Sequence, residues 1–246
     1  MTKKSKKGTY IGIRKKPQHG GKPGYLRVDS VHQGDLDKQK GVYHINLVDE
    51  VTQWEIVMTV ERIAESFLDV ALAVALDLFP FSILGFHSDN GSEYINETVA
   101  GLLRSLLIEQ TKSRARRSND NGLVETKNGS VIRKMFGYAH IPSHAAYTMD
   151  AFNREHLDVY LNYHRPCGFA TVTTDHRGKE KYDVYLTPFE KLRSLETWTQ
   201  YLRPTVTPES LEKIAQRLSD TDCATLKEKG RAVMFETIRN LTNRAV

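Results

Sequence analysis

Short runs of apolar residues alternate with polar ones in the first quarter of the chain. Runs rich in Val, Ile, Tyr and Trp predict three consecutive strands, at residues 25–31, 42–50 and 54–60. The connections between them are short and carry turn residues. This spacing favours an antiparallel meander.

Apolar residues then recur at helical spacing. The first predicted helix spans residues 63–78 and ends before Pro80. A strand follows at 82–86. Asn96 is a candidate N-cap for a second helix, and a short strand follows at 108–111. The buried stripe expected for this second helix consists of Val99, Leu102, Leu103 and Leu106.

Helical periodicity dominates the second half of the chain. A turn-rich segment opens a helix that carries Glu125, and a longer amphipathic helix ends before Pro166. Residues 167–200 are polar and predicted to be irregular, and two short helices are expected at 208–218 and 222–241. Such an order of elements predicts an α/β fold with a mixed sheet between helices. We expect a basic flexible leader at 1–24, a core at 25–166, a linker at 167–200 and a small helical segment at 201–246.

Three carboxylates occupy unusual positions in this pattern. Asp29 lies inside the first strand, Asp89 follows the apolar run 83–86, and Glu125 lies near the start of its helix. A carboxylate is a poor strand former and is costly to bury unless a cation meets it. Two acids on strands and one on a helix therefore suggest a divalent-metal site.

At these residues the sequence resembles the catalytic core of insertion-sequence transposases and retroviral integrases, the Asp-Asp-Glu recombinases. The resemblance covers residues 25–166, with 35 residues between Asp89 and Glu125. The matching positions are Asp29, then Asp89, Asn90, Gly91, Glu93 and Tyr94, then Asn121, Gly122, Val124 and Glu125.

The resemblance implies a ribonuclease H-like fold: a mixed five-stranded sheet flanked by helices, with a C-terminal helical appendage. It also implies metal-dependent DNA cleavage and strand transfer with Mg²⁺ or Mn²⁺, in which Asp29 bridges two ions and Asp89 and Glu125 each complete one. The implied partners are DNA, as element ends and target, and further copies of the chain assembled on that DNA. Relatives carry a helix-turn-helix before this core, so the chain is expected to be a truncated copy.

Several cations are candidate phosphate contacts. Arg114, Arg116 and Arg117 form a basic loop between the second and third acids, and Lys15 and Lys16 belong to the leader. Family members often carry a basic residue seven positions after the glutamate. Here that position is Ile132, and Arg133 follows it as the candidate. Lys127 and Lys134 are assigned to a solvated face.

Two glycines flank Glu125 on its helix, and other acids are weighed against Asp29 or given supporting roles. Gly122 and Gly129 lie one turn away, where they would leave room for metal and DNA backbone; alternatively, Gly122 belongs to the turn before the helix. Asp35 and Asp37, in a predicted turn, are alternatives for the first acid. Glu93 is expected to orient its loop, and Asp120 to help cap the Glu125 helix. The functional alternatives are a ribonuclease H-like nuclease that only hydrolyses, and an inactive DNA-binding remnant.

Composition and net charge narrow the functional classes of protein further. The chain has 246 residues, a net charge of +5 and 26% charged residues, which favours a soluble protein with a polyanionic partner. Cys167 and Cys223 form neither a disulfide framework nor a zinc motif, so a reducing, cytoplasmic compartment is expected. The apolar run 70–86 is interrupted by Asp77 and Pro80 and is too short to span a bilayer, which predicts no membrane partner.

Overall fold

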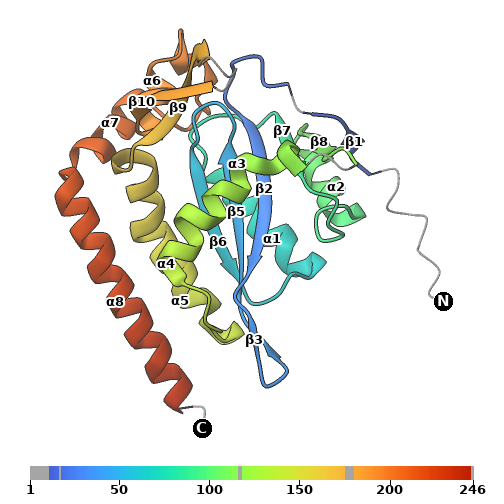
Figure 1. Ribbon diagram of the computed structural model, residues 1–246, viewed down its shortest axis with the longest axis vertical. Helices are drawn as coiled ribbons and strands as arrows, with labels where there is room; N and C mark the ends of the chain where they lie inside the picture. Colours follow the sequence, from blue (N-terminus) through green and yellow to red (C-terminus); the bar gives the residue numbers. More distant parts are fainter. Residues whose placement is uncertain (1–10, 17, 116–117, 175–179, 245–246) are drawn as a thin grey trace.

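A six-stranded sheet runs through the centre of the molecule (Figure 1). The computed structural model describes residues 11–16, 18–115, 118–174 and 180–244. The strands follow the order β1-β8-β7-β2-β5-β6 across the sheet. Their bounds are β1 Ile13–Arg14, β2 Tyr25–His32, β5 Tyr43–Asp49, β6 Glu55–Val60, β7 Gly85–Ser88 and β8 Glu109–Lys112. A small separate ladder joins β3, Asp35–Leu36, to β4, Gln39–Lys40.

The directions of the strands confirm the expected mixed, ribonuclease H-like sheet. β5 is antiparallel to both β2 and β6, whereas β7 is parallel to β2, and β8 is parallel to β7. The sixth strand, β1, was not predicted. It comes from the segment expected to be a flexible leader and pairs in parallel with β8, with Ile13 opposite Thr111. Ile11 is buried there, and its carbonyl accepts a hydrogen bond from Lys112, so this part of the expected leader is wrong.

Helices cover both faces of the sheet (Figure 1). Leu68, Leu72 and Leu103 pack against one face in a first apolar core, and Ile132, Met149 and Met234 belong to a second core on the other face. No helix among the described residues is both long and apolar enough to cross a membrane. The helical segments are α1 Glu65–Asp77, α2 Glu97–Ser105, η2 Ser118–Asn121, α3 Gly122–Lys127, η3 Asn128–Arg133, α4 Lys134–Phe136, η4 Ser143–Ala145, α5 Ala146–Phe152, η5 Asn153–Leu157, η6 Tyr160–His164, α6 Pro188–Arg193, η7 Trp198–Tyr201, α7 Pro208–Gln216 and α8 Asp220–Arg244.

The start of α2 follows the sequence expectation, and its end does not. Asn96 Oδ1 accepts a hydrogen bond from the Val99 N–H at 2.9 Å, which confirms the predicted N-cap. Val99 and Leu103 are buried as expected. Leu106, predicted to be buried, is 48% exposed because the helix ends at Ser105.

The described residues between 167 and 200 form regular elements, contrary to the expected irregular linker. β9 (Cys167–Thr174) and β10 (Glu180–Leu186) form an antiparallel hairpin, and α6 follows with a capping box between Thr187 and Glu190. The C-terminal helix α8 extends further in both directions than predicted. It is also more than an appendage, because Met234 and Ile238 on it pack into the second core beside α5.

The edge strand β6 is covered along its outer side by polar side chains from helical segments. In β6, every second backbone N–H points away from the partner strand β5. The outward N–H groups of Glu55, Val57 and Thr59 each donate a hydrogen bond, at 2.8 to 3.2 Å. The acceptors are Asn162 Oδ1 for Glu55, Asp158 Oδ1 for Val57 and Asp150 Oδ1 for Thr59.

Candidate functional site

The three predicted acids come from neighbouring elements. Asp29 lies within β2, Asp89 directly follows β7, and Glu125 lies on α3, which packs against β2 and β5. β2 and β7 are adjacent parallel strands, so both deliver an acid to the same part of the sheet. Asp29 is half-buried, whereas Asp89 and Glu125 are exposed.

The charges of both other acids act on Asp29. Burial is the largest cause that raises the pKa of Asp29, and the negative charges of Asp89 and Glu125 raise it further. Hydrogen bonds from the Ser30 N–H and the Asn128 amide act in the opposite direction. The resulting pKa is about 6, so a proton or another cation is favoured beside this carboxylate.

Asn128 fixes one oxygen of Asp29. Its Nδ2 donates to Asp29 Oδ2 at 2.7 Å, and its Oδ1 accepts from Asn46 Nδ2 at 3.0 Å. Sequence reasoning missed this contact. The available signal was its position three residues after Glu125, because side chains at i and i+3 share a helix face.

The helix that carries Glu125 changes geometry at Asn128. The α-helical segment α3 passes into the π-helical segment η3 and then into α4. π-helical turns are rare and are frequent at functional sites. A Cβ added at Gly122 or Gly129 would meet no atom within 4 Å, so open space lies beside both glycines.

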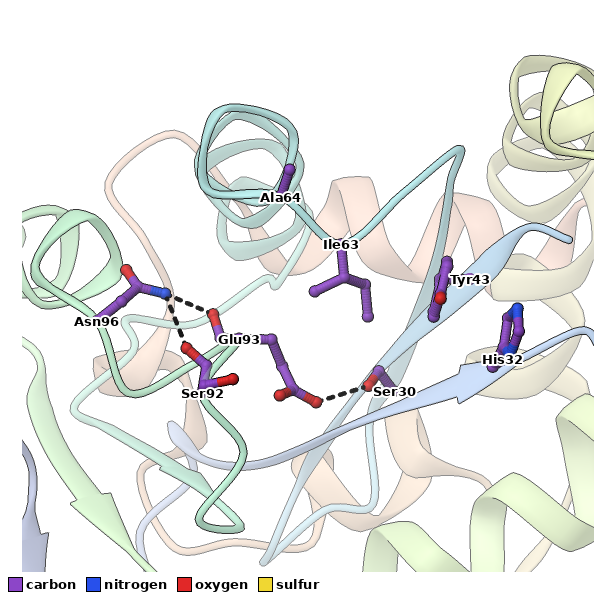
Figure 2. Close-up of a pocket in the computed structure, with 8 residues that line it drawn as sticks. All are labelled: Ser30, His32, Tyr43, Ile63, Ala64, Ser92, Glu93 and Asn96. Carbon is purple, nitrogen blue, oxygen red and sulfur yellow. Dashed lines mark hydrogen bonds between the residues drawn. The ribbon is translucent and has the colours of Figure 1, made fainter. Parts of the chain in front are cut away.

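A pocket of about 390 Å³ lies beside Ser30 on β2 (Figure 2). Ser30 Oγ donates to Glu93 Oε1 at 3.3 Å across one side of it, and Asn96 Nδ2 donates to the Glu93 carbonyl at 2.7 Å. Glu93 thus joins the loop after Asp89 to β2. The lining residues are Ser30, His32, Tyr43, Ile63, Ala64, Ser92, Glu93 and Asn96.

The first cation of the predicted basic loop is paired. The Arg114 guanidinium donates to both carboxylate oxygens of Asp120, at 2.8 and 2.9 Å. This interaction holds the pKa of Asp120 well below its usual range. Asp120 was expected to cap the Glu125 helix, but the N-cap position is Asn121, without a side-chain cap. Arg116 and Arg117 lie outside the described residues.

The remaining candidate cations lie in different settings. Arg133 donates to the His32 carbonyl at 3.0 Å and lies over the ring of Tyr138 at 4.9 Å from its centroid. Lys15 forms an ion pair with Glu109 at 2.6 Å, and Lys16 is exposed. DNA contact by these side chains stays a prediction.

Lys127 does not lie on a solvated face, so that interpretation is wrong. Its side chain is buried, with Nζ 3.4 Å from Glu55 Oε2 and 3.1 Å from Cys167 Sγ. The reason is the position of α3 across the sheet, which turns this side of the helix towards β6. Lys134 is exposed, as expected.

The donor set suits a hard cation. Asp29, Asp89 and Glu125 offer carboxylate oxygens, the ligands that Mg²⁺ and Mn²⁺ take. Among the described residues, no group of three His, Cys, Asp or Glu side chains lies close enough together to hold a metal ion. Asp89 and Glu125 are exposed, and they would have to turn towards Asp29 to share an ion with it. Metal binding there stays a prediction.

One curated protein matches part of the sequence, and no protein-family model matches it. The match is the uncharacterized protein y4rM of Sinorhizobium fredii, at 38% identity over 120 residues. These residues make up 48% of this chain and 34% of y4rM. The chain therefore spans about a third of the length of that relative.

Solved structures with a similar arrangement include retroviral integrases. The catalytic core of BIV integrase aligns with a TM-score of 0.44 and 16% identity, over 68% of this chain and 91% of that one. A simian T-cell lymphotropic virus intasome chain aligns with a TM-score of 0.49 and 17% identity, over 80% and 63%. The HTLV-2 integrase core, solved with magnesium, aligns with a TM-score of 0.41 and 19% identity, over 64% and 93%. Likeness at these scores says nothing of activity.

Proposed function

We propose that this chain is an Asp-Asp-Glu polynucleotidyl transferase that cleaves and joins DNA with Mg²⁺ or Mn²⁺. The observation that carries the proposal is the position of Asp29, Asp89 and Glu125 on three neighbouring elements, β2, the end of β7 and α3. The raised pKa of Asp29, caused by burial and then by the charges of Asp89 and Glu125, supports it. Three acids that repel one another are costly for folding. Such a cost is offset when a divalent cation binds between them.

Asp29, Asp89 and Glu125 would hold the metal. When bound, it would activate the attacking oxygen, from water or a DNA 3′-hydroxyl, and stabilise the leaving oxygen. Asn128 keeps one Asp29 oxygen in place. The Gly91 N–H does the same for Asp89, donating to its Oδ1 at 2.8 Å.

The partner in this proposal is DNA. A net charge of +5 favours a polyanion, and the predicted cations Lys15, Lys16, Arg114 and Arg133 belong to the proposed contact surface. Arg114 and Arg133 already have protein partners, so they would contact phosphate through their remaining donors. Assembly of further copies on DNA is part of the same proposal.

The experiment is an oligonucleotide cleavage and joining assay with Mn²⁺ or Mg²⁺. Glu125→Gln should abolish turnover and leave DNA affinity nearly unchanged, because it keeps the side-chain shape and removes the charge that holds metal. Glu155→Gln is the matched control, since Glu155 is exposed on a helical segment away from the acids. Equal activity in wild type and Glu125→Gln would contradict the proposed site.

Other outcomes of this assay separate the alternatives. Cleavage without joining would identify a nuclease that only hydrolyses. DNA binding without cleavage or joining, with either metal, would identify an inactive DNA-binding remnant. Joining that depends on Glu125 supports the transferase.

A further inference from the structure

A second, smaller pocket lies on the helix that carries Glu125, where this helix meets η6 and α8. Its volume is about 230 Å³. Four of its side chains are cations, and one is a carboxylate. The lining residues are Ser130, Val131, Lys134, Met135, Tyr160, Leu161, Arg165, Lys227, Glu228 and Arg231.

Two of the four cations are held in place by α8 and its neighbours. Lys227 is 8% exposed, forms an ion pair with Glu228 at 2.8 Å and lies 4.3 Å from the centroid of the Tyr160 ring. Arg231 Nε donates to the Met135 carbonyl at 2.7 Å. These contacts order the cations before any ligand arrives, which lowers the entropy lost on binding.

The other two cations have no such partners. Neither Lys134 nor Arg165 forms an ion pair or a side-chain hydrogen bond with any residue in the described ranges. Glu228 is the one carboxylate among the lining residues, and it already pairs with Lys227. Four positive charges around one negative charge leave an excess that a polyanion would neutralise.

We propose that this pocket binds a phosphate group of a DNA strand, held by Lys134, Arg165 and Arg231. The inference rests on the proposed function and extends it to a contact outside the acids. Lys134 is nine residues beyond Glu125 on one continuous helical rod, roughly 13 Å along its axis. A strand whose reacting phosphate lies at Glu125 reaches this distance within a few nucleotides. The C-terminal helix thereby contributes to DNA binding.

The test compares DNA affinity of two double variants at several salt concentrations. Lys134→Gln with Arg165→Gln removes the two unpaired cations. Lys213→Gln with Arg217→Gln removes the same charge from exposed positions on and just after α7. The pocket variant should bind DNA roughly tenfold more weakly at ~0.1 M salt, with a salt slope smaller by about one, as expected for one lost phosphate contact. The control should change neither quantity by a comparable amount.

Further measurements keep the inference separate from the proposed function. Lys134→Glu, at an exposed position, changes the charge by the same two units without the Arg165 change and should weaken binding to a similar extent. Glu125→Gln should retain full DNA affinity and lose turnover. If it did so while the pocket variant bound DNA as tightly as wild type, the proposed function would stand and only the phosphate pocket would be wrong. Inorganic phosphate is the second probe. If it raised the melting temperature through Lys134 and Arg165 while DNA affinity stayed unchanged, the pocket would take a free phosphate and the DNA assignment would be wrong.

Discussion

Asn128 Nδ2 lies 2.7 Å from Asp29 Oδ2 and links the first residue of the π-helical segment η3 to the strand that carries this half-buried acid. Asn46, on the neighbouring strand β5, holds the Asn128 amide in turn. Asn46 therefore fixes the orientation of the Asn128 amide, and the Asn128 amide in turn holds the Asp29 carboxylate. Asp29 is positioned from two elements that are far apart in the sequence.

Replacing Asn128 by Ala should lower metal-dependent cleavage by about tenfold to a hundredfold, the usual cost of removing a group that orients a metal ligand. The metal concentration for half-maximal activity should rise as well, because Asp29 is no longer held in one rotamer. Thr126→Ala is the matched control, since Thr126 bonds only the Gly122 carbonyl of its own helix among described contacts. Equal metal dependence in the two variants would contradict the positioning role.

Mg²⁺ or Mn²⁺ should raise the melting temperature, because a ligand that binds the native state stabilises it by mass action. Asp89→Ala should remove most of this shift. Asp35→Ala should retain it, since Asp35 is exposed on the short strand β3 and is an alternative first acid. Thermal unfolding with and without metal measures all three proteins. If Asp35→Ala lost the metal-induced shift and Asp89→Ala kept it, the proposed set of metal-binding acids would be wrong.

Lys127→Met should destabilise the protein by about 3 to 5 kcal/mol, because it leaves the buried Glu55 carboxylate without its cation. The double variant with Glu55→Gln should recover part of this loss. Lys229→Met, on an exposed face of α8, should change the free energy of unfolding by less than about 0.5 kcal/mol. Urea unfolding provides the measurement. A Lys127→Met protein as stable as Lys229→Met would show that the pair is not needed.

His44 should make the fold sensitive to acid. Burial, and then the charge of Arg133, lower the pKa of His44 to about 3 in the folded state, where its ring stacks on Phe136. The unfolded state therefore takes up the proton first. The contribution of neutral His44 to the free energy of unfolding is fully present above about pH 6.5. It is lost as the pH falls from there towards 3, at up to about 1.4 kcal/mol per pH unit.

The check on His44 is urea unfolding at pH 7 and pH 5 in wild type and His44→Gln. Gln can still hydrogen-bond Thr59, which lies 3.0 Å from His44 Nδ1, and it does not titrate. Wild type should lose more stability between the two pH values than the variant. If wild type and His44→Gln lost the same amount of stability between pH 7 and pH 5, the acid sensitivity would come from other groups.

The elements that sequence predicted best are those fixed by local patterns. Residues 25–31 were predicted as a strand and form β2, and Asn96 caps α2 through a bond three residues away. The strand position of Asp29 followed from the same alternation, because it depends on neighbours along the chain.

The elements that sequence missed depend on contacts between distant segments. No local sequence feature of Lys127 predicts its buried ion pair with Glu55, 72 positions earlier. No local sequence feature near Asn128 predicts a π-helical turn. The β9–β10 hairpin had a signal in the alternation of Tyr182, Val184 and Leu186, but the polar composition of residues 167–200 outweighed it. On β10, Val184 and Tyr185 are both exposed, Tyr185 at 67%.

The polar cover of β6 has a consequence for the behaviour of the protein at high concentration. An open strand edge presents a row of free backbone donors, on which a strand from another molecule can add and start an aggregate. Here the outward N–H groups of Glu55, Val57 and Thr59 are already bonded to helix side chains. At the opposite edge, the outermost strand β1 is only two residues long, which leaves little backbone for another strand to pair with. Both ends of the sheet are thus protected against edge-to-edge polymerisation by the chain's own residues.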